Sequence, residues 1–135
     1  MEQSTHEHEP RYRDLVEHSF GFIYLHDLDG VLEWINPAGA ALLGHEPAVM
    51  IGRPLTDFVT DPGAVHRYLD NIREHGEDQR MIEARTRGGE SRFLQYHNVL
   101  IRPEGRSPYV LGHAQDVSAM VAAEVENSSD KGPQA

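Results

Sequence analysis

One turn restricts more than any other feature what this chain can fold into, and it lies in FGFIYLHDLDGVLEWIN, residues 20–36. Two runs rich in β-branched and aromatic residues flank Asp29-Gly30, a pair that supplies the positive φ values of a tight turn. The pattern therefore predicts a β-hairpin. The hairpin leads directly into a short helix, because Asn36 can cap the helix that Pro37 opens and Gly44 can end it.

The order of the elements after the hairpin predicts an antiparallel α+β fold. Proline and glycine limit residues 46–58 to helices of one or two turns, and a longer amphipathic helix is expected over residues 61–76. Three β-rich segments follow, QRMIEARTR, FLQYHNVLIR and SPYVLGHAQDV. Because strands and helices do not alternate, we expect a five-stranded antiparallel sheet with short helices over one face.

Composition divides the chain into one domain with a polar segment at each end. Residues 1–9 and 127–135 have almost no apolar content, so we expect them to be disordered. The predicted domain covers residues 10–118 and begins with a flanking helix whose apolar face carries Tyr12, Leu15 and Val16. Residues 119–126 follow as a short helix that needs a packing partner to be stable.

Charge and cysteine content exclude several classes of function. Acidic residues outnumber basic ones by 22 to 12, so we expect no binding to the phosphate backbone of nucleic acids. The chain has no cysteine, which excludes disulfides, thiolate metal sites and cysteine nucleophiles. No apolar run approaches the length of a membrane span, and the N-terminus lacks the features of a signal peptide. A cytoplasmic location is therefore expected.

Motifs of catalysis or metal binding do not stand out. No Ser-His-Asp arrangement, phosphate-cradling glycine loop or HExxH spacing is present. Aspartates such as Asp27, Asp57 and Asp61 sit at turns or helix starts, where a carboxylate has a capping role. The sequence predicts neither an enzyme nor a metal site.

Four stretches in a fixed order resemble the PAS sensor domains. They are DLDG, INPAGAALLG, MIGRPLTDFV and the closing GHAQDVS, and the likeness covers nearly all of residues 11–118. The resemblance implies the PAS fold, in which sheet and helices enclose a pocket for a small molecule or cofactor. It also implies that the last strand passes a signal to the adjoining helix. In that junction Asp116 would tie the sheet to the helix, and the hydroxyl of Ser118 would cap the helix.

Strand alternation indicates which side chains would line such a pocket. Small residues at 112 and 114 would leave room for a ligand, while a hydroxyl and an amide at 96 and 98 would orient it. The alternative is a core filled by its own side chains, in which the residues at 96 and 98 hydrogen-bond to the helices. The predicted lining residues are Ile82, Ala84, Leu94, Tyr96, Asn98, Gly112 and Ala114.

The resemblance leaves the cofactor unassigned. Light-sensing flavin domains of the family bond the flavin through a cysteine, which this chain lacks, and Ala114 stands where they have a flavin-contacting Gln. Haem-binding members carry an axial His on the long helix, so His66 is the candidate iron ligand if haem binds. His66 precedes Tyr68 by two residues, whereas the oxygen sensors have a spacing of three, a difference of about 100° around a helix.

Three functions are compatible with these features. The first is a cytoplasmic sensory module that binds a small molecule and relays its state to an output domain such as the histidine kinase of a two-component system. The second is a ligand-free interaction module that forms a homodimer through the N-terminal helix and the exposed sheet face. The third is a haem-based gas or redox sensor.

Overall fold

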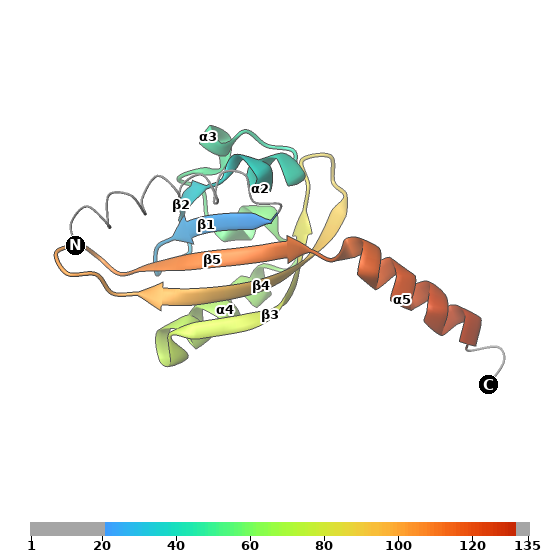
Figure 1. Cartoon of the computed structure of the whole chain (residues 1–135). Coiled ribbons are helices and arrows are strands. Elements are labelled where there is room, and N and C mark those ends of the chain that lie inside the picture. The colour runs from blue at the N-terminus through green and yellow to red at the C-terminus, as the bar shows by residue number, and fades with distance from the viewer. Residues whose placement is uncertain (1–20, 132–135) are drawn as a thin grey trace, which may run out of the picture.

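The computed structural model describes residues 21–131. They form a five-stranded sheet in the order β2-β1-β5-β4-β3, with every neighbouring pair antiparallel (Figure 1). This confirms the predicted α+β architecture. The strands span Phe22–His26 (β1), Leu32–Ile35 (β2), Glu77–Arg85 (β3), Ser91–Ile101 (β4) and Tyr109–Asp116 (β5).

The hairpin of β1 and β2 forms where predicted, but its turn is wider than a two-residue turn. Residues 27–31 connect the strands, and the carboxylate of Asp27 accepts hydrogen bonds from the backbone N–H groups of Asp29 and Val31, each at 2.9 Å. Gly30 has a φ of 84°, whereas Asp29 does not take a positive φ. The expectation is therefore wrong for Asp29, because the Asp27 side chain closes the loop in its place.

Short helices cover one face of the sheet (Figure 1), and their ends follow the predicted capping residues. Asn36 caps the first helix by accepting a hydrogen bond from the N–H of Gly39 at 3.1 Å. Asp61 caps the longest helix, and Gly76 ends it with a φ of 77°. The helices are α2 (Pro37–Leu42), α3 (Pro47–Met50), the 3-10 helix η1 (Leu55–Phe58) and α4 (Pro62–His75).

The register of the three longest strands decides which side chains face the helices. Ile82 lies opposite Leu94 on β4, and Ala114 lies opposite Tyr96. Because side chains alternate along a strand, these residues share one face with every second neighbour. This is the face that sequence alternation assigned to them.

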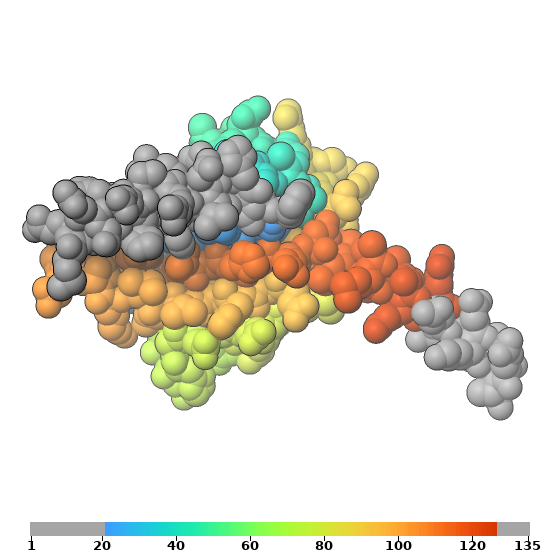
Figure 2. Space-filling view, viewed as in Figure 1, coloured from blue at the N-terminus to red at the C-terminus, as the bar shows by residue number. Residues whose placement is uncertain are grey.

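The chain leaves the sheet through α5, which spans Ser118–Lys131. The helix projects away from the sheet instead of packing along it (Figures 1 and 2). It is longer than the predicted helix over residues 119–126, and it includes residues 127–131, for which the sequence predicts disorder. Polar composition prevents burial of a segment but does not prevent a solvent-exposed helix. Within residues 21–131 no helix is both long and apolar enough to cross a membrane.

Two further predictions concern the ends of the chain. The flanking helix that begins at Pro10, like the tail of residues 1–9, lies outside the described residues. So does the rest of the expected C-terminal tail, residues 132–135. These predictions stay predictions.

A fully buried asparagine joins the first strand to the helical layer. The side-chain oxygen of Asn36 accepts hydrogen bonds from the N–H groups of Ile23, at 3.0 Å, and Gly39, at 3.1 Å. Its amide nitrogen donates to the carbonyl of Gly21 at 3.2 Å. Asn36 therefore acts both as a helix cap and as a bridge between β1 and α2.

We expect Asn36→Ala to lower the free energy of unfolding by roughly 2–4 kcal/mol, because two backbone N–H groups lose their acceptor inside the protein. The matched control is Asp61→Ala, which removes an exposed cap and should cost about 1 kcal/mol or less. Urea denaturation followed by circular dichroism measures both. Equal losses for the two variants would contradict the bridging role of Asn36.

Candidate functional site

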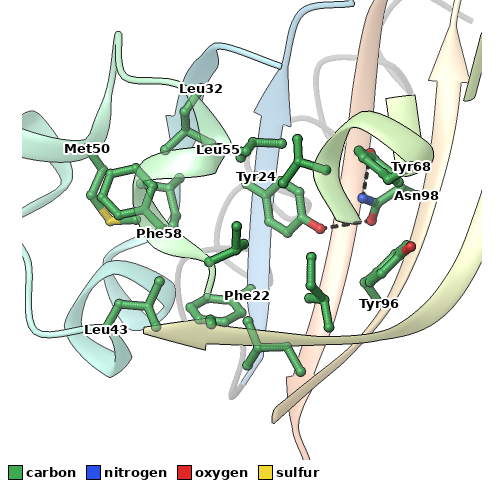
Figure 3. Close-up of a pocket in the computed structure, with 16 residues that line it drawn as sticks. Phe22, Tyr24, Leu32, Leu43, Met50, Leu55, Phe58, Tyr68, Tyr96 and Asn98 are labelled. Carbon is green, nitrogen blue, oxygen red and sulfur yellow. Dashed lines mark hydrogen bonds between the residues drawn. The ribbon is translucent and has the colours of Figure 1, made fainter. Parts of the chain in front are cut away.

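A cavity of about 90 Å³ lies between the sheet and the helices (Figure 3). Its wall combines residues from four strands, from α4 and from the short helical segments. Most of the wall is aliphatic or aromatic. The lining residues are Phe22, Tyr24, Leu32, Ile35, Leu43, Met50, Leu55, Phe58, Val59, Val65, Tyr68, Ile82, Ala84, Leu94, Tyr96 and Asn98.

Five of the seven residues predicted to line a pocket lie on the wall of this cavity, namely Ile82, Ala84, Leu94, Tyr96 and Asn98. That they contact a ligand stays a prediction. The alternative was a core filled by its own side chains, in which the residues at 96 and 98 hydrogen-bond to the helices, and the structure agrees with one part of it. Asn98 does hydrogen-bond to a helix, through Tyr68 of α4, and yet a cavity remains beside it.

Gly112 and Ala114, the other two predicted residues, do not line the cavity. The ring of Tyr24 lies over Gly112 so closely that a Cβ atom there would come within 2.2 Å of a ring carbon. Ala114 is 1% exposed and lies between Phe22 and Tyr96 in the sheet, and both of these aromatic residues line the cavity. Gly112 thus makes room for the ring of Tyr24, and neither small residue borders the cavity.

The polar groups of the wall gather at one end of the cavity (Figure 3). We call Tyr24, Tyr68, Tyr96 and Asn98 the polar end. Tyr24 donates a hydrogen bond to the Asn98 side-chain oxygen at 2.9 Å, and the Asn98 amide donates to the Tyr68 hydroxyl at 2.7 Å. Leu43, Met50 and Phe58 lie at the opposite end (Figure 3).

His26, which is fully buried on β1, extends this chain of hydrogen bonds. Its Nε2 lies 2.6 Å from the hydroxyl of Tyr68, and its Nδ1 lies 2.6 Å from the backbone carbonyl of Asp27. A carbonyl can only accept, so Nδ1 carries a proton. Burial lowers the pKa of His26, and the bond to the Asp27 carbonyl and the charge of Asp27 oppose this only in part.

The neutral imidazole gives the whole chain of hydrogen bonds one direction. With its proton on Nδ1, His26 accepts at Nε2, so the hydroxyl of Tyr68 must donate to it. Tyr68 then accepts from Asn98, whose side-chain oxygen accepts from Tyr24. The orientation of the Asn98 amide and three proton positions therefore follow from one backbone carbonyl, that of Asp27.

Tyr96 makes a separate contact at the polar end. Its hydroxyl donates to the buried carboxylate of Asp78 at 2.5 Å, and Asp78 pairs with Arg80 at 3.4 Å. Burial raises the pKa of Tyr96, and the hydrogen bond to Asp78 raises it further. Burial likewise raises the pKa of Tyr24 and Tyr68. All three phenols are therefore protonated at neutral pH.

The haem alternative does not fit this cavity. His66 lies on the exposed side of α4, while Tyr68 and Val65 occupy the side that faces the cavity. The buried imidazole is that of His26, and both of its nitrogens are hydrogen-bonded. The volume of about 90 Å³ lies below the roughly 150 Å³ of a cavity that holds benzene, and haem and flavin are both far larger than benzene. His66 therefore does not face the cavity, and the residues that line it do not fit a haem held by His66.

Sequence reasoning missed three residues of the polar network, Tyr24, Tyr68 and His26. A signal for each was present. Tyr24 and His26 lie at every second position after Phe22 on β1, and Tyr68 shares the apolar face of α4 with Val65 and Ile72.

A second candidate site is the junction between the sheet and α5. The carboxylate of Asp116 accepts from the N–H of Ser118 at 2.9 Å, as predicted for a residue that ties the sheet to the helix. The hydroxyl of Ser118 accepts from the N–H of Phe93 on β4 at 2.8 Å. The predicted helix cap at Ser118 is therefore wrong: its hydroxyl binds the neighbouring strand. Phe93 directly precedes Leu94, which lines the cavity.

Comparisons with known proteins agree with this architecture. A sequence family described as the PAS fold matches residues 16–122. The PAS domain of an HTR-like protein from Haloarcula marismortui is 23% identical, with a TM-score of 0.72, covering 85% of this chain and 96% of that one. A domain of a sensory box sensor histidine kinase/response regulator from Geobacter sulfurreducens is also 23% identical, with a TM-score of 0.70, covering 81% of this chain and 94% of that one.

A third similar structure is the PAS domain of a LuxR-family transcriptional regulator from Burkholderia thailandensis, in complex with ethanol. It is 18% identical, with a TM-score of 0.66, and the match covers 79% of this chain and 97% of that one. A search of curated protein sequences finds no match.

Proposed function

This chain belongs to the PAS family of signalling domains, and from that premise we propose that it is a cytoplasmic sensory module that binds a small molecule in the cavity and relays the occupancy to α5. Structurally similar PAS domains occur in sensor histidine kinases and transcriptional regulators. The observation that carries the proposal is the cavity itself, which lies between the sheet and the helices and has its polar side chains at one end. In this proposal the role is sensory and not enzymatic.

An empty cavity has an energetic cost that supports a binding role. Protein interiors are packed as densely as organic crystals, with few voids larger than a water molecule. At about 24 cal/mol per Å³, a cavity of about 90 Å³ forgoes about 2 kcal/mol of stability that a filled core would have. A molecule that fills the cavity would recover part of this free energy and so stabilise the closed fold.

The relay follows from the position of one short segment of β4. The side chain of Leu94 contacts the cavity, and the backbone of its neighbour Phe93 makes two hydrogen bonds at the start of α5. One is the bond to the Ser118 hydroxyl, and the other joins the N–H of Val117 to the carbonyl of Phe93 at 2.8 Å. A shift of Leu94 on ligand binding would therefore move the base of α5. The output partner in this proposal is an effector such as a histidine kinase.

Self-association is a second proposal, supported by the sheet face that points away from the helices. Trp34, Leu25, Leu111 and Val99 lie side by side across β2, β1, β5 and β4 and form an apolar row, which we call the outer row. All four are half-buried in the described structure. A homodimer through this row, with the flanking N-terminal helix, would complete the burial of these side chains.

We expect native mass spectrometry of the purified chain to detect an additional small mass that is lost on denaturation. Ala84→Leu places a larger side chain in the cavity and should abolish this mass while the fold, measured by circular dichroism, persists. The matched control is Ala41→Leu, because Ala41 is exposed on α2. A clean apo mass for the wild-type chain, or a bound mass unaffected by Ala84→Leu, would contradict binding in the cavity.

For the relay, we expect Ser118→Ala to bind the ligand normally but to uncouple α5 from it, because the N–H of Phe93 loses its acceptor. Hydrogen exchange of α5, compared with and without the bound molecule, measures the coupling. Ser118→Thr keeps the hydroxyl and should restore the coupling. Ser91→Ala, on the same strand as Phe93, should have no effect on the coupling. A ligand-dependent change in α5 that persists in Ser118→Ala would exclude this route.

For self-association, we expect Leu111→Lys to shift the chain from dimer to monomer in sedimentation velocity, because a charge in the outer row cannot be buried without a partner. Gln115→Lys places the same charge on the same strand and face, at a position that is already exposed, and should leave the dimer intact. A wild-type chain that is monomeric at all concentrations would refute the proposal.

A further inference from the structure

We propose that the cavity selects a small neutral molecule with an apolar body and one hydroxyl group, such as a short-chain alcohol. The inference rests on the proposed function, since it assigns a chemical class to the molecule that the cavity binds. It follows from the hydrogen-bonding capacity that the polar end still has after its internal bonds are made.

All three phenol protons at the polar end are already committed. Tyr24 donates to Asn98, Tyr68 donates to His26, and Tyr96 donates to Asp78. No hydroxyl proton therefore points at a ligand unless one of these buried bonds breaks. A group that can only accept hydrogen bonds, such as a ketone or an ether, gains nothing from the three phenols.

The capacity that remains is mostly for accepting. Among the hydrogen bonds of residues 21–126, none is donated to the hydroxyl oxygen of Tyr24 or of Tyr96, and both residues line the cavity. One hydrogen of the Asn98 amide goes to Tyr68, and the other is unassigned. A ligand hydroxyl matches this set, because it donates to a phenol oxygen and accepts from the amide hydrogen.

Charge selects against acids and amines. Among the described residues that line the cavity there is no lysine, arginine, histidine or acidic side chain. The charge nearest to the polar end is the carboxylate of Asp78, in contact with Tyr96 and paired with Arg80. A carboxylate ligand would be buried without a cation and would face Asp78 across Tyr96. An ammonium ligand would lose its hydration without direct contact with a carboxylate, because Asp78 is already paired.

The volume and the apolar wall of the cavity define the rest of the ligand. The apolar end is formed by side chains such as Leu43, Met50 and Phe58, so the body of the ligand should be hydrocarbon. The volume of about 90 Å³ is below that of a cavity that holds benzene, roughly 150 Å³, so the chain should be only a few carbon atoms long. A linear or branched alcohol of this size satisfies both ends.

The test is a titration of the full chain, followed by ¹H–¹⁵N NMR at pH 7, with four probes of similar size. They are 1-propanol, acetone, propionate and n-propylamine. We expect 1-propanol to bind most tightly and acetone to bind roughly three- to tenfold more weakly, the value of one hydrogen bond. Propionate and n-propylamine should bind more weakly still. Equal or tighter binding of any of the other three probes would overturn the proposal.

Variants show whether the alcohol occupies the polar end. Tyr96→Phe should weaken the binding of 1-propanol roughly three- to tenfold and leave the binding of acetone unchanged, because the variant removes an acceptor. Tyr24→Phe provides a second test if Tyr96→Phe fails to fold. Tyr109→Phe, on the opposite sheet face, is the control and should change neither probe. An equal loss for both probes would indicate a merely structural effect and would overturn the assignment.

The outcomes also separate this inference from the proposed function. If Ala84→Leu leaves the binding of 1-propanol unchanged, the alcohol binds outside the cavity and the inference fails. If none of the four probes binds while native mass spectrometry still detects a bound molecule, the ligand class is wrong but the sensory proposal stands. If neither probes nor bound mass are found, both fail.

Discussion

The side-chain amide of Asn98 holds the two layers of this domain together. It lies on β4, accepts from Tyr24 on β1 and donates to Tyr68 on α4, so one buried group connects the sheet to the longest helix. Each partner would leave a buried polar atom unsatisfied if it moved away, at a cost of about 1–3 kcal/mol per group. The hydrogen bond from Asn98 to Tyr68 sets the distance between α4 and the sheet at this point. The cavity is the space that remains beneath the helical layer.

This arrangement explains how a core can be both ordered and incomplete. The helices that cover the sheet are mostly one or two turns long, and capping residues such as Asn36 and Asp61 determine where they begin. Short helices present few side chains, so they cannot fill the sheet face as densely as one long helix would. Aromatic rings from the sheet itself, chiefly Tyr24 and Tyr96, compensate by filling the space above small neighbours such as Gly112.

Much of the fold could be predicted from local signals, and the errors share a physical origin. Turn and capping residues predicted the hairpin and the limits of α4, and strand alternation placed five residues on the cavity wall. Alternation gives the face of a residue but not what covers it, so it does not predict that the ring of Tyr24 covers Gly112 or that Ala114 lies outside the cavity wall. The contacts of Tyr24 and Tyr68 with Asn98 join residues 74 and 30 positions apart, and no local pattern reports such pairs.

The carbonyl of Asp27 has a consequence for how ligand preference could drift during evolution. It lies in the hairpin loop, remote from any ligand, yet it fixes the tautomer of His26 and so every proton along the chain to Tyr24. If a change in the loop turned this carbonyl away, the other tautomer of His26 would reverse Tyr68, the Asn98 amide and finally Tyr24. The hydroxyl of Tyr24 would then donate into the cavity. A domain of this kind could thus change from preferring ligands that donate a hydrogen bond to preferring ligands that accept one. No substitution in its binding site would be needed.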